Sequence, residues 1–253
     1  MLTYPAPTTR EEKFEMINTL KDRLLAVHGD AILAIGVYGS IALETDGPYS
    51  DIEMHVITKD GSKIKTLEFV YDKFKIELTT NNRSAFLEEA QEVDDSWAIK
   101  AGAFIHILPI HDPTLLFEQI KNLPLEISDD ARRHIMKEFM VWEVYETVGK
   151  IRNNYSRSNL NYIPTGARDL LWQTVKLIGL SNKAYYSTRA RTLEESLQMD
   201  SIPSGYRELL DFMQSGELQD AAKFYYLCEE LWTGLNEWYA EMKLDYRLTE
   251  LPI

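Results

Sequence analysis

The sequence predicts an α+β protein, with a mixed sheet flanked by helices in its N-terminal domain and a helical bundle as its C-terminal domain. Up to about residue 125, short apolar runs alternate with turn-forming residues, as is typical of strands. Beyond that point, apolar residues recur every three or four positions over long stretches, as is typical of helices. The chain has 253 residues, enough for two domains that each bury a core. We therefore expect one domain over residues 1–127 and a second over 128–253.

The first element expected is a helix that runs to about Val27. Thr9 and Glu12 have the spacing of a capping box, in which each side chain bonds the backbone of the other. Apolar residues then recur at helical intervals. A buried strand is expected next, over 31–38, because an apolar run there ends at the turn formers Gly39 and Ser40.

Further strands are expected over 51–58, 64–71 and 74–79, the last two as an antiparallel pair joined at Asp72-Lys73. Turn formers fill the loop 45–50. In the second half, helices are expected over 129–154, 164–180, 191–199, 205–215 and 218–243. Pro164 suits the start of a helix, and Gly216 suits the end of one.

The charge balance excludes one class of partner. The chain has 27 Lys and Arg against 40 Asp and Glu, for a net charge of −13, whereas non-specific nucleic-acid binding requires an excess of basic residues. Residues 1–127 hold 12 basic and 21 acidic residues, so the first domain carries −9 of the net charge of −13. No signal sequence or membrane span is evident, and the single cysteine, Cys228, cannot form an intrachain disulfide. We expect a cytoplasmic protein without nucleic-acid or membrane partners.

One segment combines residues that suit nucleotide chemistry. Gly39 and Ser40 follow the apolar strand, and the start of a helix after such a turn favours phosphate. Asp51 and Glu53 lie two apart on a strand, so that both carboxylates project from one face. Mg²⁺ takes few carboxylates and completes its shell with water and substrate phosphates. Such a pair taken alone is more often a solvated strand face.

The run AIGVYGSIALETDGPYSDIEM, residues 34–54, resembles the signature of the polymerase-beta-like nucleotidyltransferase superfamily. It is most similar to the aminoglycoside 4′-O-nucleotidyltransferase (kanamycin nucleotidyltransferase) family. Further matches extend over nearly the whole chain: FKIEL at 74–78, ILPIHD at 107–112, YETVGKIRN at 145–153 and IPSGYRELLDFMQSGELQD at 202–220. The resemblance implies that the N-terminal domain has the polymerase-beta-like nucleotidyltransferase fold.

The resemblance also implies roles for individual residues. The implied catalytic residues are Glu146, Asp51 and Glu53. Glu146 would be the general base. The other implied roles are as follows: Gly39, Ser40 and Lys150 for the nucleotide; Asp51, Glu53 and Glu77 for Mg²⁺; and Lys75, Glu77, Glu143 and Glu146 for the aminoglycoside. The spacing of Glu143, Glu146 and Lys150 agrees in placing them on one helix face, although spacing alone fits a surface ion pair better.

The chain departs from the family motif at Leu43, where the family has an arginine. One cationic contact to the phosphates is therefore missing, and Lys150 or Lys75 would carry more of that role. The acidic pair Asp94-Asp95 also differs in detail from the family pattern.

The activity implied is Mg²⁺-dependent transfer of AMP from ATP, or from another nucleoside triphosphate, to the 4′-hydroxyl of an aminoglycoside such as kanamycin, tobramycin or amikacin. Pyrophosphate would leave, and the antibiotic would be inactivated. The family also implies a homodimer with shared active sites. Two alternatives stay open: an enzyme of the same fold that acts on another acceptor, and a non-catalytic binding or antitoxin-like protein.

Overall fold

The computed structural model describes residues 4–252, and the chain divides into two compact units. The first unit comprises Met1–Glu92 and Lys100–Glu126, and the second comprises Val93–Ile99 and Ile127–Ile253. The expected division into two continuous segments is therefore wrong for residues 93–99. They pack with the second unit because Trp97 is buried and the Ala98 carbonyl accepts a hydrogen bond from the Tyr186 backbone N–H at 2.8 Å.

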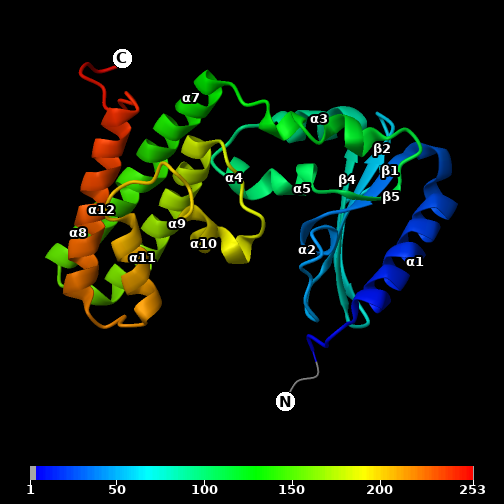
Figure 1. The fold of residues 1–253 in the computed structure, drawn as a ribbon, viewed down its shortest axis with the longest axis horizontal. Helices are drawn as coiled ribbons and strands as arrows, with labels where there is room; N and C mark the ends of the chain where they lie inside the picture. The colour runs from blue at the N-terminus through cyan, green and yellow to red at the C-terminus, as the bar shows by residue number, and fades with distance from the viewer. Residues whose placement is uncertain (1–3, 253) are drawn as a thin grey trace. The chain divides into compact units, whose positions relative to one another are not determined.

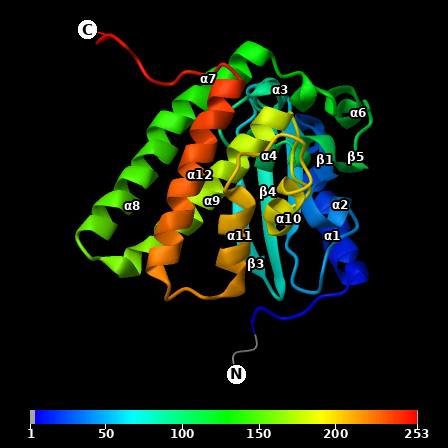
Figure 2. The ribbon, with the colours of Figure 1, turned by 60° about the vertical axis from the view of Figure 1, so that its left-hand side comes forward.

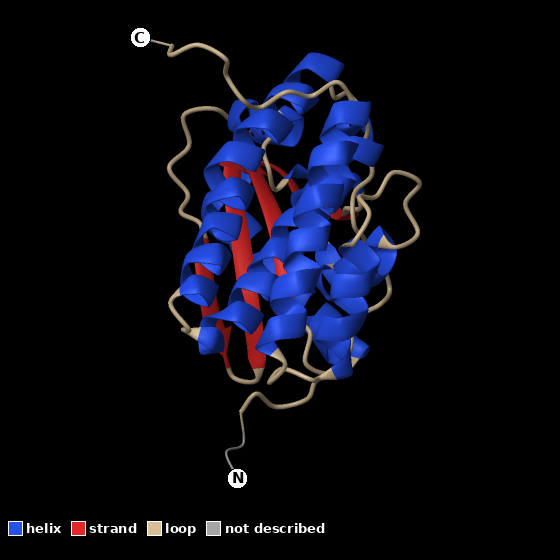
Figure 3. Cartoon of the chain, turned by 90° about the vertical axis from the view of Figure 1, so that its left-hand side faces the viewer, coloured by secondary structure: helices blue, strands red, loops and turns tan. Residues whose placement is uncertain are grey.

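The first unit is built on a five-stranded mixed sheet with the strand order β3-β4-β2-β1-β5 (Figures 1 and 3). The strands are β1 (Ile32–Val37), β2 (Ile52–Thr58), β3 (Leu67–Tyr71), β4 (Phe74–Asn82) and β5 (Leu108–His111). Strands β2 and β4 are parallel, whereas β1 pairs antiparallel with β2 and β5, and β3 pairs antiparallel with β4. The predicted antiparallel pair around residues 72–73 is confirmed, although its first strand begins at Leu67 rather than at residue 64.

Helices cover both faces of this sheet. They are α1 (Arg10–His28), α2 (Gly39–Ala42), α3 (Arg83–Gln91), α5 (Gly102–Ile105) and α6 (Leu116–Ile120), with 3-10 turns at η1 (Gly29–Ala31) and η2 (Leu123–Leu125). The predicted capping box at Thr9 and Glu12 is present at the start of α1. Ile17 of α1 joins the core on one face, and Figure 1 shows α1 running along the sheet. Phe86, Phe104 and neighbouring side chains of α3, α5 and α6 form the core on the other face.

The second unit contains helices and no strand within its described residues (Figure 2). Its elements are α4 (Trp97–Lys100, whose last residue belongs to the first unit), α7 (Asp129–Phe139), η3 (Met140–Tyr145), α8 (Glu146–Ser156), η4 (Leu160–Tyr162), α9 (Ile163–Asn182), η5 (Arg189–Arg191), α10 (Thr192–Ser196), α11 (Tyr206–Ser215) and α12 (Ala221–Glu241). Helix α9 is the centre of the bundle, since it contacts α7, α8, α10, α11 and α12. Gly216 ends α11 in the left-handed conformation, as predicted.

The prediction of one continuous α-helix over 129–154 is wrong in the middle of that range. Residues Met140–Tyr145 form a π-helical turn, η3, between α7 and α8. Such a turn shifts a few backbone hydrogen bonds by one residue, a change that apolar periodicity does not register. Within residues 4–252, no helix combines the length and the apolar character needed to cross a bilayer.

Candidate active site

The turn after β1 is shaped by a glycine. Gly39 has φ +69°, in the left-handed region that favours glycine, and it begins the short helix α2. A Cβ at this position would overlap the carboxylate of Glu53. The sequence motif therefore brings the backbone at Gly39 into direct contact with a carboxylate of the neighbouring strand β2.

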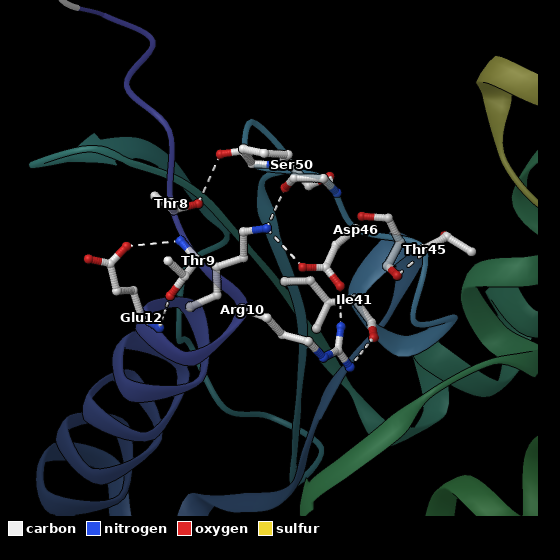
Figure 4. Close-up of polar contacts among 12 residues, drawn as sticks. Thr8, Thr9, Arg10, Glu12, Ile41, Thr45, Asp46 and Ser50 are labelled. Carbon is white, nitrogen blue, oxygen red and sulfur yellow. Dashed lines mark hydrogen bonds and ion pairs between the residues drawn. The ribbon is translucent and has the colours of Figure 1, made fainter.

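The loop between α2 and β2 is held by buried polar contacts (Figure 4). Lys13, which is only 1% exposed, donates hydrogen bonds to Asp46 at 2.8 Å and to the Gly47 carbonyl at 2.5 Å. Arg10 also pairs with Asp46 and donates to the Ile41 carbonyl at 3.1 Å. Burial raises the pKa of Asp46, but Lys13 and Arg10 outweigh burial, and the pKa falls below its usual value. These contacts fix the loop that leads from Gly39-Ser40 to Asp51.

Three carboxylates lie near this turn on one face of the sheet. Glu53 of β2 stands beside Glu77 of β4 in the parallel register. Asp51 precedes β2 by one residue, and its carboxylate accepts a hydrogen bond from Lys75 of β4 at 3.1 Å. Lys75 and Glu77 are two apart on β4, as Asp51 and Glu53 are two apart on β2, so that all four side chains share a face.

Tyr38 connects two of these strands. Its backbone N–H donates to the Glu53 carbonyl at 3.0 Å, and its hydroxyl donates to Glu77 Oε1 at 2.9 Å. Thr79 also donates to Glu77 Oε1, at 3.1 Å. Below Tyr38, the buried ring of His55 stacks at 4.1 Å between centroids. The sequence analysis did not single out Tyr38 or Thr79, although Tyr38 directly precedes the Gly-Ser pair.

The electrostatics of this cluster favour a cation. Burial, together with the nearby charges of Asp51 and Glu77, raises the pKa of Glu53 to about 7, against an opposing effect of Lys75. Hydrogen bonds to Glu68 and Asp51 raise the pKa of Lys75, so that this side chain stays protonated. A nearby positive charge stabilises the ionised form of a carboxylate in this environment.

The predicted metal site consists of three carboxylates, and Mg²⁺ prefers hard oxygen ligands. Among the described residues, no three His, Cys, Asp or Glu side chains are placed to enclose a metal ion by themselves. Mg²⁺ does not require such a cage, because it typically takes one or two carboxylates and completes its shell with water and phosphate oxygens. Asp51, Glu53 and Glu77 supply hard oxygen ligands of that kind.

The second unit contains a cavity of about 620 Å³. Its lining includes five carboxylates, two lysines and four aromatic residues: Asp94, Asp95, Glu138, Glu143 and Asp169; Lys150 and Lys176; Phe139, Trp142, Tyr162 and Trp172. Thr147 and Gln173 lie among them. The excess of carboxylates gives the cavity the character of a site for a cationic, hydroxyl-rich molecule.

Two of the predicted residues line this cavity, and a third lies beside it. Glu143, in the π-helical turn, and Lys150, in α8, belong to the lining. Glu146 does not, but its carboxylate pairs with Lys150 at 2.7 Å. Gln173 of α9 donates to Glu143 at 3.3 Å and to Thr147 at 2.9 Å. The sequence analysis missed Gln173 and Asp169, which no motif marks.

Comparison with known proteins identifies the family. The KNTase C-terminal domain family matches residues 114–245. An aminoglycoside nucleotidyltransferase (4′) from Staphylococcus aureus is 32% identical over 234 residues, which cover 92% of this chain and 92% of the relative. A protein of the same name from a Bacillus species gives the same identity and coverage. The chain belongs to the aminoglycoside nucleotidyltransferase (4′) family.

The predicted resemblance, the α+β fold class and the assignment as an enzyme are confirmed by these matches. The chain is a nucleotidyltransferase. The solved structure of a nucleotidyltransferase-like protein from Exiguobacterium sibiricum aligns with this chain at 15% identity and a TM-score of 0.49. The alignment covers 92% of this chain and 80% of that protein.

The nucleotidyltransferase thus presents its predicted site residues as two sets, one in each unit. Gly39, Ser40, Asp51, Glu53, Lys75 and Glu77 belong to the first unit; Glu143, Glu146 and Lys150 belong to the second. Ser40 is held in place near the first set, because its carbonyl accepts a hydrogen bond from the Thr45 backbone N–H at 2.9 Å.

Proposed function

We propose that the enzyme transfers AMP from ATP to the 4′-hydroxyl of an aminoglycoside such as kanamycin, tobramycin or amikacin. Pyrophosphate leaves, and the modified antibiotic is inactive. The acidic cavity of the second unit is the observation that carries this proposal. Its five carboxylates and aromatic walls suit a sugar with several ammonium groups. The names of the full-length relatives point to the same acceptor.

The first unit would bind the nucleotide. The backbone at Gly39 and the hydroxyl of Ser40 lie at the start of α2, where N–H groups favour phosphate oxygens. Asp51, Glu53 and Glu77 would hold Mg²⁺. The metal ion, when bound, neutralises charge on the triphosphate and orients it. Another nucleoside triphosphate could serve instead of ATP, since these contacts recognise phosphates rather than a base.

The second unit would bind the acceptor and remove its proton. Glu143 and its neighbours attract the ammonium groups, and Glu146 takes the proton of the 4′-hydroxyl as its oxygen attacks the α-phosphorus of ATP. The bond from that phosphorus to the bridging oxygen then breaks, and pyrophosphate departs with the electron pair. Lys150, which pairs with Glu146 at 2.7 Å, would contact the phosphates. Lys75 and Glu77 would add contacts to the acceptor.

Transfer requires the bound nucleotide and the bound acceptor to meet. We propose that this occurs in a homodimer whose active sites are shared between subunits. Mixing two inactive variants tests this point: Asp51→Ala and Glu146→Gln subunits should regain activity together only if a site draws residues from two copies. Sedimentation or light scattering would measure the oligomeric state directly.

The decisive assay measures pyrophosphate release from ATP with kanamycin, tobramycin or amikacin, with and without Mg²⁺. NMR of the product would locate the new phosphodiester at the 4′ position. If the enzyme binds ATP but releases no pyrophosphate with any of the aminoglycosides, the result would favour another acceptor. Failure to bind ATP at all would favour another nucleoside triphosphate as the donor. The KM for the aminoglycoside should also rise with ionic strength, because salt screens the attraction between charges.

A further inference from the structure

Helix α9 supplies one wall of the acidic cavity in the second unit. Asp169, Trp172, Gln173 and Lys176 are spaced so that they share a face of the helix, and all four line the cavity. Arg189 lies over the ring of Trp172 at 5.1 Å and supports it as part of this wall. The family motifs in the sequence do not include any of these residues.

The two lysines of the cavity are already paired with carboxylates. Lys176 pairs with Asp95 at 2.5 Å, and Lys150 pairs with Glu146 at 2.7 Å. Asp169 differs from both of these acids. Asp169 forms an ion pair with the adjacent Arg168 at 3.2 Å, and the Arg168 side chain is 73% exposed. An exposed ion pair of this kind contributes little to the stability of the fold. The Asp169 carboxylate can therefore exchange that contact for a ligand.

Asp169 lines the same cavity as Lys150, whose ammonium pairs with the predicted base Glu146 at 2.7 Å. Tyr162, which lines the same cavity, has its pKa raised first by burial and then by the charge of Asp169, with Glu146 adding to the effect and Lys150 opposing it. Asp169 and Glu146 thus lie within electrostatic range of one hydroxyl. Because Glu146 pairs with a lysine of the cavity lining, a ligand that presents a hydroxyl to Glu146 would extend into the cavity that Asp169 lines.

A buried amide in the same wall provides an independent indication of a binding site. Gln173 is 8% exposed, and its Nε2 donates to Thr147 and Glu143. Its Oε1 is buried without a hydrogen-bond partner within the described part of the chain. An unsatisfied buried acceptor is destabilising, so natural proteins keep few of them, often at functional sites. This one lies beside Glu143 in a cavity suited to a donor-rich ligand.

We propose that Asp169 binds the 6′-ammonium group of the sugar ring whose 4′-hydroxyl is modified, and so determines which aminoglycosides the enzyme prefers. Trp172 forms the adjoining wall, and Gln173 holds Glu143 in position for a second ammonium. The inference rests on the proposed function, because it assigns a contact to the acceptor of that reaction.

The test compares neomycin with paromomycin, which differ only in having an ammonium or a hydroxyl group at the 6′ carbon, two bonds from the carbon that bears the modified hydroxyl. Wild-type enzyme should have a lower KM for neomycin. Asp169→Asn should raise the KM for neomycin by about tenfold, as expected for one charge-assisted hydrogen bond. Its KM values for paromomycin and ATP should stay unchanged. Asp211→Asn, an exposed position on α11, makes the same charge change outside the cavity and should alter none of them.

Calorimetric titration of both aminoglycosides, without nucleotide, separates this inference from the proposed function. Wild-type enzyme that binds neomycin more tightly, but transfers no nucleotide to it, would contradict the function and leave the Asp169 contact standing. The inference is overturned if Asp169→Asn keeps the preference for neomycin, if it weakens both ligands equally, or if wild-type enzyme shows no preference.

Discussion

The carboxylate of Glu53 fills the space in which a Cβ of residue 39 would lie. Gly39 is therefore required twice, once for its left-handed backbone at φ +69° and once for the absence of a side chain. The contact joins the two halves of the nucleotidyltransferase motif, because Gly39 begins α2 and Glu53 belongs to β2.

Gly39→Ala should inactivate the enzyme without unfolding it. The added Cβ displaces the Glu53 carboxylate, and a displacement of about 1 Å at a catalytic group can cost roughly a hundredfold in rate. Gly61→Ala is the matched control, since Gly61 has φ +85° and no atom within 4 Å of the added Cβ. Both variants should lose about 1–2 kcal/mol of stability from backbone strain. Equal activity in the two variants would refute the role of the Gly39–Glu53 contact.

Asp51→Ala should abolish the Mg²⁺-dependent activity. The substitution removes one proposed metal ligand and the hydrogen bond that Lys75 donates at 3.1 Å. The rise in melting temperature that Mg²⁺ with a non-hydrolysable ATP analogue gives to wild-type protein should be lost as well. Asp22→Ala, on the exposed face of α1, is the control and should behave as wild type. Normal Mg²⁺ activation of Asp51→Ala would exclude Asp51 as a metal ligand.

Glu146→Gln should keep ATP binding and lower turnover by about 10²–10⁴, the usual contribution of a general base. The amide is similar in size to the carboxylate but accepts no proton at neutral pH. Rates are to be compared at saturating ATP and aminoglycoside, with the exposed Glu237→Gln as control. Turnover within threefold of the control would show that another group takes the proton.

Lys13→Met should destabilise the first unit by up to about 3–5 kcal/mol, because it removes one of the two cations, Lys13 and Arg10, that pair with the buried carboxylate of Asp46. The side chains of Lys13 and Asp46 are 1% and 4% exposed. Lys121→Met breaks the exposed pair with Glu118 and should cost at most about 1 kcal/mol. Urea unfolding measures both. A double variant, Lys13→Met with Asp46→Asn, should recover part of the loss, and no recovery would argue against the ion pair as its cause.

Acid should weaken the fold through His55. Burial lowers the pKa of His55 to about 4, although a hydrogen bond with the Ala103 carbonyl opposes the shift. Between pH values of about 6.5 and 4, the unfolded chain binds a proton that the folded chain does not, so stability falls as the pH falls. The contribution of His55 to this loss should approach roughly 3 kcal/mol across that range. Urea unfolding of wild type and His55→Gln at several pH values measures it, and identical slopes would contradict the prediction.

Local patterns in the sequence predicted most of the elements. The capping box at Thr9, the strand before Gly39-Ser40 and the glycine that ends α11 all depend on interactions between residues a few positions apart. The same patterns did not predict the π-helical turn at 140–145, because one extra residue in a turn hardly changes the spacing of apolar side chains. They also missed the crossing of residues 93–99 into the second unit, which depends on the distant partners Gly179 and Tyr186.

The sequence by itself determined the family, the fold class and the identity of the motif residues, because these follow from residue types at fixed spacings. Only the tertiary structure decided which side chains meet. Glu77 stands beside Glu53 because β2 and β4 pair in a parallel register, and Asp169 shares a cavity with Glu143 because α9 packs against α8 and the π-helical turn. Strand register and helix packing arise from contacts across the whole domain, and no local pattern contains them.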